Sequence, residues 1–136
     1  MVEEACKLNK QLIENGQVTF LLASAEKLPF NHETFDKVFT VNTIYFWDNQ
    51  ALILSEIHRV LKQNGQITIA IRPKSVMEHY PFVKFGFTMF TKEDLINLLN
   101  RNNFKVIDTL EKDEPVQEIN GDKMTVETLL ISAVKQ

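Results

Sequence analysis

Apolar runs rich in β-branched residues alternate along the chain with segments of helical periodicity, and this alternation restricts the fold more than any other feature. The apolar runs are residues 17–23, 35–42, 66–72, 104–111 and 124–135. The helical patterns are residues 2–15, 49–62 and 91–102. Strands that alternate with helices predict an α/β domain with mostly parallel strands and right-handed crossovers. An Asn-Gly pair at residues 120–121 separates the last two runs, which predicts an antiparallel hairpin at one edge of the sheet.

Short signals mark where the helical patterns begin and end. An Asn-Gly pair follows the first pattern at residues 15–16 and the second at residues 64–65, as is typical of helix carboxyl ends. The third pattern begins at Thr91 with Asp94 three residues later, which predicts a capping box. No repeat or linker interrupts the chain, so we expect a single domain over residues 1–136.

The composition fits a globular protein and argues against several classes of function. Lys and Arg are scattered and the net charge is −3, so the sequence predicts no nucleic-acid partner. No apolar run approaches the ~18 residues that cross a bilayer, and the chain does not open like a signal peptide. We therefore expect no membrane contact and a cytoplasmic location. Cys6, the only cysteine, lies on an apolar helical stripe and is expected to be buried. No His, Cys, Asp or Glu residues have the spacing of a metal site.

The expected ligand site lies where the predicted strands end. In open α/β sheets, ligands bind beyond the carboxyl ends of the strands. Three such ends occur here, at residues 23–25, 41–43 and 72–73. The first two belong to the stretch ASAEKLPFNHETFDKVFTVN, which couples two apolar runs through a turn at Pro29.

Four segments in register resemble the class I S-adenosylmethionine-dependent methyltransferases. They are ASAEKLPF (23–30), FDKVFTVNTIYFW (35–47), EIHRVLKQNGQITIA (56–70) and FTKEDLINLLNRNNFKVIDT (90–109). The likeness is greatest to the small-molecule group related to the ubiquinone and menaquinone methyltransferases. The resemblance implies a Rossmann-like sheet of strand order 3-2-1-4-5-7-6, S-adenosylmethionine as cofactor and a small-molecule methyl acceptor.

The resemblance also implies which residues contact the cofactor. The segment that begins at Ser24 contacts the adenine: the Ser24 side chain accepts from the exocyclic amine, the Ala25 N–H donates to the ring, and Glu26 orders the turn or faces solvent. Ser24 stands where the family commonly has Asp. Val41 and Asn42 lie under the methionyl end of the cofactor.

Aromatic residues downstream are candidates for the acceptor site. Tyr45, Phe46 and Trp47 either wall the substrate pocket or pack where a strand passes to a helix. His79 and Tyr80 lie in the aromatic-rich segment 73–90, where a His or Tyr serves as a general base or is a surface residue.

Glu56 and Arg59 are three residues apart on a predicted helix. Such a spacing is typical of a surface ion pair, and exposed pairs of this kind contribute little to stability. The remaining histidines, His32 and His58, have the positions of a turn residue and an exposed helix residue.

The glycine-rich loop of the family is not found in these 136 residues. The four glycines, at positions 16, 65, 86 and 121, lie far apart, and the first segment resembles the helix that follows the family's second strand. The resemblance therefore predicts a truncated methyltransferase domain whose first two strands are missing. Residues 35–42 then form a sheet edge, and an exposed apolar edge pairs readily with another strand. We expect residues 17–23 to close onto that edge, or two chains to pair across it as a homodimer.

Two classes of function follow. The first is S-adenosylmethionine-dependent methyl transfer to a small-molecule acceptor. The second is a non-catalytic methyltransferase fold that acts as a dimerisation or partner-binding module. The sequence does not specify the methyl acceptor.

Overall fold

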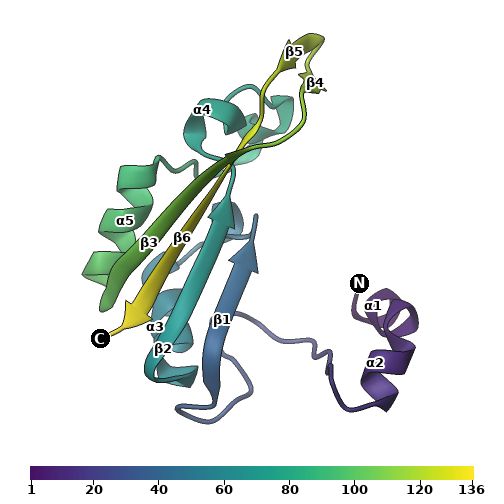
Figure 1. Cartoon of the computed structure of the whole chain (residues 1–136), viewed down its shortest axis with the longest axis vertical. Coiled ribbons are helices and arrows are strands. Elements are labelled where there is room, and N and C mark those ends of the chain that lie inside the picture. Colours follow the sequence, from purple (N-terminus) through teal and green to yellow (C-terminus); the bar gives the residue numbers. More distant parts are fainter.

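The computed structural model describes all 136 residues and contains a four-stranded mixed sheet with helices on one side (Figure 1). The main strands are β1 (Phe35–Val41), β2 (Leu61–Ile71), β3 (Phe104–Asp113) and β6 (Glu127–Lys135), and a separate hairpin pairs β4 (Gln117–Ile119) with β5 (Asp122–Met124). The α-helices are α1 (Val2–Leu8), α2 (Lys10–Glu14), α3 (Gln50–Val60), α4 (Lys74–Met77) and α5 (Lys92–Arg101). Two 3-10 turns, η1 (Ile44–Phe46) and η2 (Pro81–Phe85), complete the chain.

The strand order is β1-β2-β6-β3, which equals the 4-5-7-6 part of the expected order. β1 and β2 are parallel, whereas β6 runs antiparallel to both β2 and β3. The predicted α/β class and the carboxyl-terminal antiparallel hairpin are confirmed, and the Asn-Gly pair at residues 120–121 forms the turn of the β4–β5 hairpin at the tip of that element. β1 pairs only with β2, so the predicted edge is also present.

The predicted strand over residues 17–23 is wrong. These residues belong to no sheet, and Leu21 and Leu22 are exposed. An apolar run becomes a strand only where another strand offers hydrogen-bonding partners, and the segment leads away from β1 toward α2 (Figure 1). The expected closure of this run onto the β1 edge therefore does not occur.

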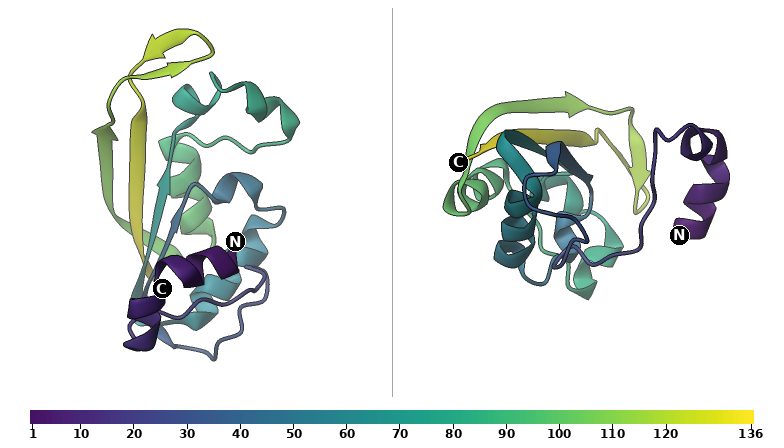
Figure 2. Two further views of the ribbon diagram at one scale, coloured as in Figure 1. Left: turned by 90° about the vertical axis from the view of Figure 1, so that its right-hand side faces the viewer. Right: turned by 90° about the horizontal axis from the view of Figure 1, so that it is seen from below.

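The predicted single helix over residues 2–15 is two short helices that meet at Asn9. The Asn9 side chain donates to the Ala5 carbonyl, 2.9 Å away, and the Asn9 backbone leaves the helical region with φ of −118°. Neither helix buries a residue, and Cys6 is only partly covered rather than buried. Both helices stand apart from the sheet (Figures 1 and 2), which explains why the apolar stripe does not bury its thiol.

α3 and α5 cover the same face of the sheet (Figure 2). α3 begins where the Asn49 side chain accepts from the Leu52 N–H, and α5 begins with the predicted capping box between Thr91 and Asp94. The core lies beneath these helices. It contains Ile53, Leu54 and Ile57 of α3, Leu95 and Leu99 of α5, and Ile67, Ile69 and Ile71 of β2.

The opposite face of the sheet has no helix upon it. Residues that pair across neighbouring strands share a face of the sheet. One such row runs across all four strands and consists of Val41, Ala70, Leu130 and Leu110. Val41 and Leu110 are each about half exposed. The residues that line a shallow hollow of about 370 Å³ include Lys37, Phe39, Val41, Thr68, Ala70 and Leu130. Both faces of the sheet thus carry apolar residues, but helices cover only one of them.

We predict that two Leu→Ala substitutions in α3 differ greatly in their effect on the free energy of unfolding. Leu54→Ala removes a fully buried side chain and should lower the free energy of unfolding by about 2–5 kcal/mol, because a cavity remains in the core. Leu52→Ala, on the exposed side of the same helix, should cost less than about 1 kcal/mol. Urea denaturation followed by circular dichroism measures both, and equal losses would contradict the assignment of the covered face.

Candidate active site at the carboxyl ends of β1 and β2

The Tyr45 hydroxyl joins the carboxyl ends of β1 and β2. It accepts from the backbone N–H of Arg72, 2.6 Å away, and its proton points to the Arg72 carbonyl at 3.2 Å or to the Asn42 side-chain oxygen at 3.1 Å. The Tyr45 side chain is buried, and this burial raises the pKa of its phenol above 10.0. Tyr45 therefore remains a neutral phenol at physiological pH.

Asn42 turns the chain out of β1. Its φ of 53° lies in the left-handed region, which Asn tolerates better than most residues. Its N–H donates to the Ala70 carbonyl at 2.9 Å, which extends the β1–β2 pairing by one bond. The side chain of Asn42 consequently lies at the rim of a cavity rather than along the strand.

That cavity has a volume of about 150 Å³ and is lined mainly by apolar side chains. Its lining consists of Asn42, Tyr45, Phe46, Arg72, Met77, Phe82 and Phe87. The Phe87 ring contacts the rings of Phe46 and Phe82, with centroids 4.7 and 5.2 Å apart. Such edge and tilted contacts hold the aromatic wall together.

Arg72 is the only charged residue in this lining. Its Nη2 contacts a Glu114 oxygen at 3.4 Å, and its guanidinium carbon lies 5.7 Å from the centroid of the Tyr80 ring. Hydrogen bonding from Thr128, together with the charge of Arg72, lowers the pKa of the Glu114 carboxyl. Arg72 is thus held from two sides at the end of β2.

The structure brings only some of the predicted acceptor residues to the cavity. Tyr45 lines the cavity and also packs into the core. Trp47 packs against the core and does not line the cavity. His79 is exposed outside the cavity, whereas Tyr80 stacks on Phe82 behind the lining, with ring centroids 5.1 Å apart.

The predicted adenine-contacting residues form an exposed turn. The Ser24 hydroxyl accepts from the Glu26 N–H at 3.2 Å, and the Lys27 N–H donates to the Ser24 carbonyl. The Ala25 N–H makes no hydrogen bond within the chain, so it is free to donate to a ligand. Of the predicted cofactor residues, Val41 and Asn42 lie at the end of β1, and no hydrogen bond joins them to the Ser24 turn.

Sequence reasoning missed Arg72, Met77, Phe82 and Phe87. Arg72 closes an apolar strand whose end was expected to face a ligand, and a charged residue in that place is a usable signal. The two phenylalanines belong to the aromatic-rich segment 73–90, but that segment has no periodicity from which to select them.

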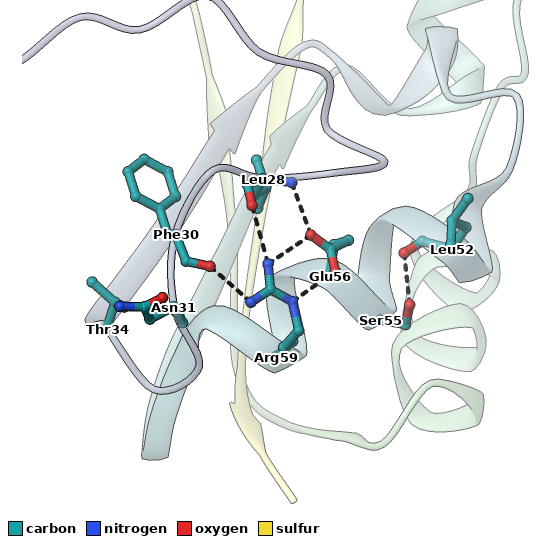
Figure 3. A network of polar contacts seen from close by, with 8 residues as sticks. All are labelled: Leu28, Phe30, Asn31, Thr34, Leu52, Ser55, Glu56 and Arg59. Atoms are coloured by element: carbon teal, nitrogen blue, oxygen red, sulfur yellow. Dashed lines mark hydrogen bonds and ion pairs between the residues drawn. The ribbon is translucent and has the colours of Figure 1, made fainter.

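A partly buried ion pair anchors the loop that follows the Ser24 turn (Figure 3). Glu56 accepts from Arg59 through both carboxylate oxygens, at 2.7 and 2.9 Å, and from the Leu28 N–H at 2.8 Å. Arg59 also donates to the carbonyls of Leu28 and Phe30. The Glu56 and Arg59 side chains are 16% and 24% exposed, so the pair is partly buried rather than on the open surface as expected. The pair satisfies the backbone of a loop that has no strand partner.

This site defines the class of protein. A cavity lies beside the polar turn at Asn42, at the carboxyl ends of the parallel strands β1 and β2. These are the features of an α/β protein that binds a small ligand there.

The comparisons with known proteins identify the family. A model of the methyltransferase domain family matches residues 1–69, and the chain belongs to this family. The relatives include the O-methyltransferase resE of Aspergillus sclerotiorum, which is 26% identical over 79% of this chain and 43% of its own length. The ubiquinone/menaquinone biosynthesis C-methyltransferase UbiE of Desulfotalea psychrophila is 32% identical over 64% of this chain and 34% of its own length. The predicted resemblance to class I S-adenosylmethionine-dependent methyltransferases is confirmed.

Solved structures agree on the fold. Geranyl diphosphate C-methyltransferase from Streptomyces coelicolor A3(2), crystallised with Mg²⁺, geranyl diphosphate and S-adenosyl-L-homocysteine, superposes with a TM-score of 0.74. The match covers 99% of this chain and 60% of the other at 12% identity, which shows a common fold. The chain spans less than half the length of the curated relatives named above.

Two further properties can be stated directly. No three His, Cys, Asp or Glu side chains are grouped so that they could hold a metal ion. None of the helices has the length and apolar composition that crossing a bilayer requires.

We predict that Glu56→Gln destabilises the chain in a pH-dependent manner. The Arg59 and Leu28 hydrogen bonds lower the pKa of Glu56 from 4.5 to about 2. Its carboxylate therefore contributes stability above pH 4.5, and this contribution is lost as the pH falls toward 2. The difference in unfolding free energy between the wild type and Glu56→Gln should have its maximum value at pH 6 and decrease steadily below pH 4.5.

Urea denaturation at a series of pH values measures that difference. Glu118→Gln is the matched control, because Glu118 is exposed and makes no ion pair. A Glu56→Gln effect that stays constant from pH 6 to pH 2.5 would contradict the role of the ionised carboxylate.

Proposed function

We propose that this chain takes part in S-adenosylmethionine-dependent methyl transfer to a small-molecule acceptor. One observation carries the proposal: a chain of the methyltransferase family places an aromatic-lined cavity directly beside the Asn42 turn, where the family's cofactor would end. The relatives named above, which methylate oxygen or carbon, support this class of reaction.

The residues fit the cofactor on one structural test. The free Ala25 N–H and the exposed Ser24 side chain offer the donor and acceptor that an adenine edge requires. We assign the adenine to Ser24 and Ala25, with Glu26 holding the turn, and the methionyl end to Val41 and Asn42. When bound, S-adenosylmethionine would supply the methyl group from its sulfonium.

The remaining work of the chain is to position the acceptor and exclude water. The Phe46, Phe82 and Phe87 rings would enclose the acceptor, and Tyr45 would hold the cavity floor in place. Trp47 would support this wall from the core side. Alignment and desolvation of this kind account for much of the rate in a transfer that needs little acid or base catalysis. His79 and Tyr80 are the sequence candidates for removing a proton from the acceptor, and neither lines the cavity.

The direct test is titration calorimetry of the chain with S-adenosyl-L-homocysteine. We expect binding in a one-to-one ratio, and we expect Ser24→Asp to raise the affinity roughly tenfold, because a carboxylate accepts more strongly from the exocyclic amine. Ser75→Asp, on the exposed surface of α4, adds the same charge and should leave the affinity unchanged. Absence of binding by a folded sample up to millimolar ligand would reject the cofactor site.

One observation favours the second function, a dimerisation module. The β1 edge is unpaired, and Phe39 on that edge is 78% exposed. Apolar edges pair with other strands, so a homodimer would join two copies through β1. Sedimentation equilibrium at micromolar concentration should then report a dimer, and Phe39→Lys should return it to a monomer, since edge lysines oppose strand pairing. A monodisperse wild-type monomer would contradict this second function.

A further inference from the structure

Arg72 has hydrogen-bonding capacity that its own chain does not use. Nη2 is the only guanidinium nitrogen with a partner, and that contact to Glu114 is long at 3.4 Å. Nε is buried and has no partner at all. A buried donor without a partner costs free energy, so such a group indicates a ligand or a water that completes it.

A second unused group lies against Arg72. The Tyr80 hydroxyl is also buried without a partner, and the Tyr80 ring packs against the Arg72 guanidinium. Tyr80 in turn stacks on Phe82, which lines the cavity. Arg72 in the lining of the cavity and Tyr80 outside that lining therefore each leave a donor free.

The cavity limits the size and the chemical character of a ligand that could bind beside Arg72. At about 150 Å³ it has room for about one aromatic ring, the size of an engineered apolar cavity that admits benzene. Its walls are aromatic or apolar except at Asn42 and Arg72. Asn42 offers a neutral amide at the rim, so Arg72 supplies the only full charge.

Glu114 holds the guanidinium in place without saturating it. Its lowered pKa keeps it ionised, and it is itself bonded by Thr128 and Gln117, which fix its position. A guanidinium fixed in this way keeps the planar donor geometry that matches a carboxylate.

We propose that the cavity binds a single-ring aromatic carboxylate, with its ring among Phe46, Phe82 and Phe87 and its carboxylate on Arg72. This inference rests on the proposed function in one respect: it names the chemical class of the methyl acceptor. Its physical basis, the unused donors beside an aromatic cavity, does not depend on the cofactor.

The experiment compares benzoate with benzamide, which has the same shape and no charge, by titration calorimetry on the chain. We expect benzoate to bind at least roughly tenfold more tightly, the usual advantage of a hydrogen bond to a charged group. Arg72→Gln should abolish this preference. The Tyr45 contact uses the main chain of Arg72, so Arg72→Gln keeps that contact and the fold.

Lys92→Gln is the matched control, because it removes one positive charge from an exposed pair with Glu111 outside the cavity. It should leave the preference for benzoate intact. Equal affinity for benzoate and benzamide, no binding of either, or a preference that survives Arg72→Gln would each overturn the proposal.

Failure of this inference differs from failure of the proposed function. If S-adenosyl-L-homocysteine binds and benzoate shows no preference, the acceptor class is wrong and the methyltransferase function stands. If benzoate binds through Arg72 and S-adenosyl-L-homocysteine does not bind, the anion site stands and the cofactor assignment fails.

Discussion

The bond between the Tyr45 hydroxyl and the backbone of Arg72 is the contact on which the site depends. It links the ends of two parallel strands at the point where their regular ladder stops, and it lies beneath the cavity. Tyr45 can make this contact because Asn42 adopts a left-handed conformation and returns the chain across the sheet. Without this link, the η1 turn and Arg72 would have no fixed relation to each other. The ligand site is therefore a consequence of strand pairing.

Local patterns in the sequence predicted most of the fold because local physics determines it. The Thr91 capping box, the left-handed turn at residues 120–121 and the apolar run of β2 each form within a few residues, and each is present in the structure. Asn103, between α5 and β3, likewise adopts a left-handed φ of 62°. The prediction of a strand at residues 17–23 is wrong because strand formation does not depend on local sequence alone. A strand requires a partner, and no local pattern records whether that partner is present.

The sequence predicts where the candidate site lies but not all of the residues that line it. The cavity lies at the carboxyl ends of two strands, where the sequence predicts a ligand site, and Asn42 and Tyr45 line it. Arg72 and the Phe82–Phe87 wall come together through a connection without periodicity, so only tertiary packing selects them. The Glu56–Arg59 pair shows the same limit. Its spacing is that of a surface pair, but the Leu28–Phe30 loop covers it and converts it into a loop anchor.

The central claim is that the Ser24 turn and the end of β1 serve one cofactor, although no hydrogen bond joins them in the structure. Backbone amide shifts of a ¹⁵N-labelled sample during titration with S-adenosyl-L-homocysteine test this claim most directly. The account predicts that the amides of Ala25 and Asn42 shift together along one saturable curve. Shifts at only one of these two places, or none on a folded sample, would contradict it.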